Sequence, residues 1–378
     1  MGQVSYTVIT MGTPNSLTPS CLHRFIAICI FSMFSLTISA QAVDDSVFLS
    51  NADRFAESLS KEKNFITLAE KIVDAFPDDL SRARAAFRWI TDQIRYDYKF
   101  VNRGDELDKP DCGNNPECGM LMKNWETGYL RKIMSSRKTT AEGYAKLYKK
   151  LCDLMYIPCE YIQGYARTKP YQIGNNMGAN HFWNAIYIHS SWYYCDPTWA
   201  AGYCTEDDEG LLTSYVRQFE PYYWLQKQDR FFRNHYPKKG FQVEPLPFSK
   251  EQFFNKPFYF SAKVLDQVNE VSPATGVVKC RKGDSILFSF YYLKNIEKIQ
   301  VNSNIFRNPP VKVWQKTGKK KYEWVTDEWA MRKQQYAAFA RDGNLYSLYV
   351  PVKHESLYYI ELVFDGTTAI RYRIRVEP

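Results

Sequence analysis

Ala141-Glu142-Gly143-Tyr144-Ala145 opens a predicted amphipathic helix that runs to about Met155. Two other stretches follow: His181-Phe182-Trp183-Asn184 begins a predicted strand, and Asp196-Pro197-Thr198-Trp199 ends the strand after it. A helix start, a histidine that opens one strand and an aspartate that closes the next are the places from which a cysteine–histidine–aspartate amidase site is assembled. In this chain the residue at the helix start is an alanine.

The alanine at position 141 removes the group that such a site needs for attack. A cysteine at a helix N-terminus has its thiolate favoured by the dipole, and the backbone N–H groups there can hold an oxyanion. A methyl group cannot attack a carbonyl. Helix rotation, helix length and strand alternation place the other candidate nucleophiles away from His181. These candidates are Thr140, Cys152, Cys159 and Cys195.

The elements around these stretches predict an α+β layer arrangement. Apolar residues at helical spacing predict helices over residues 61–76, 78–94 and 125–134. Residues 159–166 indicate a strand, and residues 182–188 and 192–195 indicate a hairpin. A helix followed by consecutive antiparallel strands is typical of α+β folds.

The chain changes character towards its C-terminus. Residues 219–248 are rich in aromatics and prolines and are interpreted as an irregular segment over the first domain. Beyond Pro257 six short runs alternate in the manner of strands: 259–264, 285–292, 311–314, 345–350, 358–364 and 369–376. Asp365-Gly366 is a strong hairpin turn. We therefore predict an all-β, immunoglobulin-like sandwich over residues 257–378, after a first domain over residues 43–256 with its motif core at 137–202.

The N-terminus has the pattern of a secretory signal peptide. Arg24 precedes an uncharged apolar run over residues 25–40, and Ala40-Gln41-Ala42 forms a small-residue cleavage site. We expect residues 1–42 to be removed, which predicts a secreted or periplasmic protein, including one attached to the cell surface. The run is short for a membrane span, so no stable span is expected after removal.

Charge and cysteine spacing exclude several classes of function. The formal net charge of +8 over 378 residues is mild, and the cluster Lys319-Lys320-Lys321 is better explained as a solvated hairpin tip than as a nucleic-acid site. No spacing of cysteine and histidine matches a zinc site, so neither a metal nor another cofactor is expected. In an oxidising compartment Cys112 could pair with Cys118, and Cys195 with Cys204.

With these motifs the chain resembles the transglutaminase-like superfamily, in particular secreted proteins of the kyphoscoliosis-peptidase type. The resemblance covers roughly residues 60–255. It implies a papain- or transglutaminase-like first domain in which His181 is the general base and acid, Asp196 orients it, and Ala141 occupies the place of the catalytic cysteine. It also suggests that Tyr96 lines the cleft, together with Trp183 and Trp199.

Three functional hypotheses follow. The first is a pseudoenzyme that binds a peptide or protein ligand in the relic cleft, with no nucleic-acid partner. The alternative is an active amide hydrolase or acyltransferase of the cysteine-peptidase kind with a substitute nucleophile. In the third, the β-sandwich carries an interaction function and the first domain is scaffold. We favour the first and third together.

Overall fold

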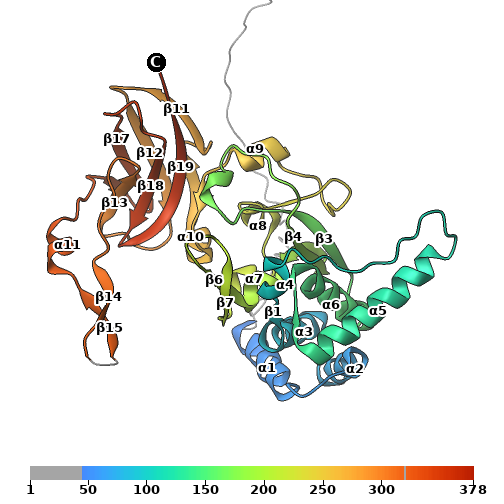
Figure 1. Cartoon of the computed structure of the whole chain (residues 1–378). Helices are drawn as coiled ribbons and strands as arrows, with labels where there is room; N and C mark the ends of the chain where they lie inside the picture. The colour runs from blue at the N-terminus through green and yellow to red at the C-terminus, as the bar shows by residue number, and fades with distance from the viewer. Residues whose placement is uncertain (1–44, 319–320) are drawn as a thin grey trace, which may run out of the picture. The chain divides into compact units, whose positions relative to one another are not determined.

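The computed structural model describes residues 45–318 and 321–378, with the side chains of residues 45–48 excepted (Figure 1). The predicted signal peptide, residues 1–42, lies outside the described residues. Three helices come first: α1 (Asp45–Ser58), α2 (Phe65–Ala75) and α3 (Asp79–Gln93). The Asn64 and Asp78 side chains cap α2 and α3 by accepting from backbone N–H groups of the first turn. The helices predicted over 61–76 and 78–94 are thereby confirmed, with shorter bounds.

A polar loop and a long helix follow. After α4 (Tyr98–Asn102) the chain forms a loop that ends in a disulfide between Cys112 and Cys118, and α5 (Cys118–Ser136) begins there. This helix is longer than the predicted 125–134. Of its residues, Leu130, Ile133 and Met134 are buried, so its first turns carry no apolar periodicity that could be detected in the sequence. The other proposed disulfide is absent, because Cys195 and Cys204 are both free thiols.

One helix and one antiparallel sheet form the centre of the first part of the chain. The helix is α6 (Ala141–Leu154). The sheet has the order β5-β4-β3-β8, with β3 (Cys159–Ala166), β4 (His181–Ile188), β5 (Ser191–Cys195) and β8 (His235–Pro237). The strand over 159–166 and the hairpin of β4 and β5 are as predicted. Strand β8 lies inside the segment that we expected to be irregular.

Short elements surround this centre. The strands β1 (Arg95–Tyr96) and β2 (Lys138–Thr139) pair in parallel just before α6. The helix α7 (Pro197–Ala201) leads into a hairpin of β6 (Gly202–Glu206) and β7 (Leu212–Arg217). The remaining segments are η1 (Pro170–Gln172), η2 (Pro221–Tyr223), α8 (Gln228–Phe231) and α9 (Lys250–Phe254). A large hydrophobic cluster, which includes Phe87, Trp89, Tyr144, Tyr148 and Trp183, joins these helices to the sheet.

The C-terminal part consists mainly of β-strands in two larger sheets. One has the order β10-β12-β17-β16, and the other contains β11-β19-β18-β13 with β9 paired to β19. Their bounds are β9 (Phe258–Tyr259), β10 (Val268–Ser272), β11 (Val277–Arg281), β12 (Ser285–Tyr292), β13 (Ile299–Ser303), β16 (Ala340–Asp342), β17 (Leu345–Pro351), β18 (Tyr359–Phe364) and β19 (Thr367–Glu377). A second hydrophobic cluster takes residues from both sheets. The hairpin of β14 (Lys312–Lys316) and β15 (Tyr322–Thr326) and the helix α11 (Glu328–Arg332) complete this part.

Two local predictions in this part have different outcomes. The Asp365-Gly366 turn is confirmed, since it joins β18 to β19 and both residues have positive φ, 46° and 80°. The strand predicted over 259–264 is wrong beyond Tyr259, because residues 262–267 form helix α10 (Ala262–Gln267). Ser261 caps that helix by accepting from the Val264 N–H, and this start signal prevails over the apolar alternation. Among the described residues, no helix has the length and apolar character needed to cross a bilayer.

Substitutions in β12 test the packing of the second cluster. Phe288 is fully buried against Tyr372, whereas its neighbour Leu287 points to the other face and is 42 % exposed. We expect Phe288→Ala to lower the free energy of unfolding by about 3–5 kcal/mol, because it leaves a cavity. The control Leu287→Ala should cost less than about 1 kcal/mol. Urea denaturation measures both, and equal effects would contradict this packing.

Candidate functional site

Four of the five residues in the Ala141–Ala145 stretch make contacts that hold the first turn of α6. Glu142 accepts from Lys109 Nζ at 2.8 Å. Gly143 has no room for a side chain, because a Cβ there would lie 2.6 Å from the Tyr129 hydroxyl. The Tyr144 hydroxyl donates to the Ile94 carbonyl at 2.9 Å, and the Ala145 carbonyl accepts from Asn184 at the same distance. The motif therefore fixes the start of α6 against α3, α5 and β4.

Ala141 is the first residue of α6 and is 6 % exposed. The preceding residue, Thr140, has extended backbone and makes no side-chain cap. Two residues before Ala141, Thr139 pairs with Tyr96 in the small parallel ladder of β1 and β2. The helix start thus lies directly beside the segment that carries Tyr96.

His181 and Asp196 come together as expected. His181 begins β4, opposite Gly164 of β3, and Asp196 follows the last residue of β5. The Nε2 atom of His181 donates to Oδ2 of Asp196 at 2.7 Å. The other carboxylate oxygen, Oδ1, caps helix α7 by accepting from the N–H groups of Thr198 and Trp199 at 2.9 and 3.0 Å. Asp196 is fully buried.

The structure adds a residue that the sequence analysis did not select, His235. It lies in β8, and its Nε2 donates to the same Oδ2 of Asp196 at 3.1 Å. Its ring stacks on Phe231 with centroids 4.2 Å apart, and the Asn234 side chain contacts its Nδ1 at 2.7 Å. His235 lies within residues 60–255, the range over which the sequence resembles the family. Its role could not be inferred, since β8 has only three residues and no periodicity.

The charges of this cluster follow from burial and hydrogen bonding. Burial acts to raise the pKa of Asp196, but the charges and hydrogen bonds of His181 and His235 outweigh it and hold that pKa well below its usual range. Burial lowers the pKa of His235 to about 4, against the opposing effect of Asp196. These directions favour an ionised carboxylate at Asp196, while burial acts against the charged form of His235.

His181 faces a cavity of about 570 Å³. Tyr96 and Trp199 line the same cavity, and the Trp199 ring lies 5.1 Å from the His181 ring between centroids. Burial raises the pKa of Tyr96 to about 12, so its hydroxyl stays protonated. Trp183, which we also expected at the cleft, is fully buried and packs edge-on against His235 at 5.0 Å instead.

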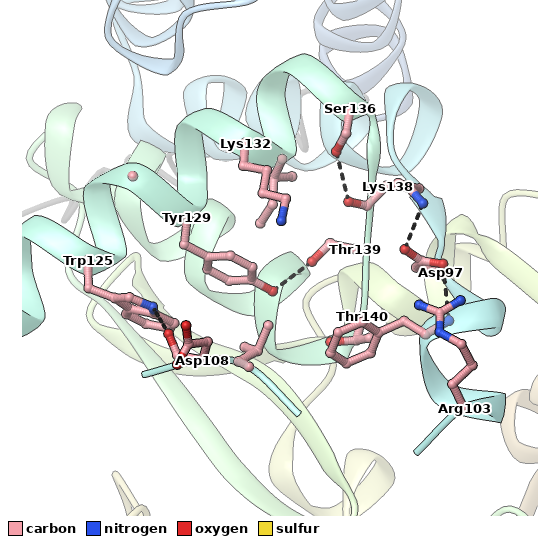
Figure 2. Close-up of a pocket in the computed structure, with 14 residues that line it drawn as sticks. Asp97, Arg103, Asp108, Trp125, Tyr129, Lys132, Ser136, Lys138, Thr139 and Thr140 are labelled. Carbon is pink, nitrogen blue, oxygen red and sulfur yellow. Dashed lines mark hydrogen bonds and ion pairs between the residues drawn. The ribbon is translucent and has the colours of Figure 1, made fainter. Parts of the chain in front are cut away.

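A second cavity, of about 560 Å³, is bordered by the residues that precede Ala141 (Figure 2). Figure 2 shows Trp125, Tyr129 and Lys132 of α5 on one side and Thr139 and Thr140 on another. The Tyr129 hydroxyl and Thr139 Oγ1 are hydrogen-bonded at 2.8 Å, and Lys138 pairs with Asp97 at 3.1 Å. Asp97 lines this cavity while its neighbour Tyr96 lines the first, so two consecutive residues border one cavity each.

Within the described residues, one group of three has the arrangement to hold a metal ion, namely His181, Asp196 and His235, whose ligand atoms lie within 4.8 Å of one another. In the structure these same atoms are used by the two hydrogen bonds to Oδ2. The cluster is thus satisfied as a hydrogen-bonded unit, and the absence of a metal stays a prediction.

The pKa of His235 predicts a pH dependence of stability. Its folded pKa of about 4 lies below the ordinary value of 6.5, so between these values the unfolded chain binds a proton that the folded chain does not. The free energy of unfolding should then fall as the pH is lowered through this window, by up to about 3 kcal/mol. The depressed pKa of Asp196 adds a further loss only below about pH 4.

Urea denaturation at a series of pH values measures this dependence. His235→Gln keeps an N–H donor for Asp196 and removes the titrating group, so its stability should vary less between about pH 6.5 and pH 4. His354→Gln, which replaces an exposed histidine, is the matched control. An unchanged slope in His235→Gln would show that His235 does not cause the dependence.

Comparisons with known proteins agree with this geometry. A sequence model of the Transglutaminase-like superfamily matches residues 66–197, a range that includes the start of α6, His181 and Asp196. The chain is similar to the kyphoscoliosis peptidase of Homo sapiens, with 24% identity over 235 residues, which are 61% of this chain and 32% of that protein. It is also similar to hillarin of Drosophila melanogaster, with 27% identity over 230 residues, 58% of this chain and 26% of that protein.

A solved structure described as a TGase covers 49% of this chain and 39% of its own chain, with 11% identity and a TM-score of 0.24. A score of that size supports no argument about the fold. The chain spans about a third or less of the length of these two curated relatives. From the family match and the arrangement of α6, β4 and Asp196, residues 66–197 are part of a transglutaminase-like domain.

Proposed function

We propose that this protein is a pseudoenzyme that binds a peptide or protein ligand in the cleft of its transglutaminase-like domain without cleaving or transferring it. The observation that carries the proposal is the contrast within the site. The His181–Asp196 pair is buried, hydrogen-bonded at 2.7 Å and open to a cavity. The first residue of the helix whose N-terminus would carry the nucleophile has only a methyl group.

The free thiols of the chain support this proposal over the alternative of a substitute nucleophile. Cys204 lines the cavity of His181, but burial raises its pKa to about 11. Burial also raises the pKa values of Cys152 and Cys195, both fully buried, far above neutral. Because the thiolate is the nucleophile, these neutral thiols are poorly suited to attack an amide.

The two cavities, one lined by Tyr96 and the other by its neighbour Asp97, suggest how a ligand would lie. An extended peptide that passes these two residues could place one side chain beside Trp199 and Tyr96 and another beside Trp125 and Tyr129. Both cavities combine aromatic rings with charged side chains, such as Lys132 in the second and Arg167 in the first, and this mixture suits a ligand with apolar and polar groups. We infer that such a ligand is met outside the cytoplasm, on the basis of the predicted signal peptide.

We also propose that the C-terminal part, from residue 257 on, is an immunoglobulin-like sandwich that serves as scaffold or as a binding module. Two sheets that contribute to one hydrophobic cluster support this assignment. The second sheet is mixed, because β11 pairs with β19 in parallel while its other strand pairs are antiparallel.

Restoring the thiol tests the relic site. In Ala141→Cys the new sulfur would lie at a helix N-terminus, and a relic site requires it to reach His181, so its pKa should be lowered and iodoacetamide should alkylate it below about pH 7. The matched control is Asn124→Cys, an exposed position in the interior of α5 and away from a helix N-terminus, which should react only near the pH of an ordinary thiol. Mass spectrometry of the labelled peptide at several pH values measures both.

Two results bear on the interpretation. Adding His181→Ala to Ala141→Cys should shift the alkylation profile back towards that of an ordinary thiol. If folded Ala141→Cys reacts like Asn124→Cys, position 141 is not a relic nucleophile site, and the proposal fails.

The alternative enzyme has its own test. An active hydrolase or acyltransferase would show amide turnover by the purified chain that disappears in His181→Ala and persists in His354→Ala. We expect no such turnover, because a triad without its nucleophile retains only the residual rate due to binding and oxyanion contacts. Turnover that depends on His181 would overturn the pseudoenzyme.

A further inference from the structure

The hairpin of β14 and β15 presents an aromatic and cationic face to solvent. Trp314 lies opposite Trp324, and Lys316 lies opposite Tyr322. Because side chains alternate along a strand, six residues share one face, which we call the Trp–Lys face: Lys312, Trp314, Lys316, Tyr322, Trp324 and Thr326. The exposed fraction of its aromatic residues is 56 % for Trp314, 50 % for Tyr322 and 65 % for Trp324.

The Trp–Lys face contains no acidic residue. Glu323 points to the opposite face, where it pairs with Lys321 at 2.6 Å. In the described part of the chain, neither Lys312 nor Lys316 forms an ion pair with an acid. The face therefore combines large rings with two uncompensated positive charges.

The hairpin leaves this face free. Its strands form a two-stranded sheet of their own and pair with neither of the larger sheets, and Figure 1 shows the hairpin extending from the neighbouring strands. The half-buried residues Val313 and Val325 lie on its other face. Contiguous exposed apolar surface of this kind on a soluble chain marks an interaction site more often than not.

The pairing of the tryptophans alone explains part of the arrangement. Cross-strand aromatic pairs stabilise a hairpin, and the Trp314 ring lies 5.5 Å from that of Trp324 and 6.3 Å from that of Tyr322 between centroids. These contacts involve all three rings. They do not account for the two lysines on the same face.

We propose that the Trp–Lys face binds the surface of a lipid bilayer that contains anionic headgroups. Tryptophan and tyrosine favour the boundary between water and hydrocarbon, because their rings are apolar with one polar edge. Lysines near an anionic bilayer are attracted to its headgroups, and their stems can follow the rings while the ammonium groups stay in water. Rings and charges on one face can engage such a surface together.

A single-stranded nucleic acid also carries negative charge, but the arrangement of the rings fits a nucleic acid less well than a bilayer surface. Its bases stack on aromatic platforms, whereas the Trp314 and Trp324 rings are tilted by 55° and contact each other. They leave no slot between them for a base. The proposal concerns a surface separate from the cleft, so it does not rest on the proposed pseudoenzyme function.

Vesicle sedimentation of the chain from residue 43 onward tests the proposal. We expect binding to vesicles of phosphatidylcholine with phosphatidylglycerol and little binding to phosphatidylcholine alone. Two double variants should each weaken binding by about tenfold or more: Trp314→Ala with Trp324→Ala, and Lys312→Glu with Lys316→Glu. The lysine variant keeps the tryptophan pair, so a destabilised hairpin cannot account for its effect.

The controls are variants of similar chemistry elsewhere on the surface. Tyr349→Ala removes a ring that is 67 % exposed on β17, and Lys279→Glu with Lys353→Glu makes the same change of net charge; both should bind vesicles like the parent chain. Absence of vesicle binding, equal loss in the controls, or hairpin-dependent binding of an anionic polysaccharide or single-stranded oligonucleotide without vesicle binding would each overturn the proposal.

Discussion

The buried carboxylate of Asp196 is the group on which the geometry of the site depends. A charge removed from water is costly, and it is tolerated where enough donors replace the lost hydration. Here four N–H groups do so, two from the first turn of α7 and two from imidazole rings. Because these donors belong to α7, β4 and β8, a single side chain fixes the relative positions of three segments that are far apart in the sequence.

The motif around Ala141 is explained mainly by the fold. Gly143 permits the close approach of Tyr129, Tyr144 bonds to the end of α3, and the Ala145 carbonyl receives Asn184 from β4. None of these contacts involves the side chain of residue 141. A cysteine and an alanine at that position are therefore compatible with the same helix start, and the rest of the motif can persist for structural reasons alone.

The extent to which the sequence predicted the structure follows the strength of local signals. Helix α6 and strand β3 have clear periodicity and were placed almost to the residue, and the positions of His181 and Asp196 follow from the strands that they begin and end. His235 was not selected, because β8 is defined by its pairing with β3 and not by any pattern of its own. The position of Trp183 was also mispredicted, because the alternation of side chains along β4 does not show which face borders the cleft and which borders the core.

The two proposed binding surfaces, the cleft and the Trp–Lys face, are each unusual in burial or charge, but in different ways. Sequences usually satisfy burial, charge and hydrogen bonding together, and departures concentrate where function requires them. At the cleft, the departure is a buried carboxylate whose two oxygens are both hydrogen-bonded within the chain, so its preservation can reflect stability as well as binding. On the Trp–Lys face the Trp314 ring contacts those of Trp324 and Tyr322, but the rings stay at least half exposed and no described acid pairs with the two lysines. These exposed rings and unpaired charges are explained better by an external binding surface than the internally bonded cleft network is.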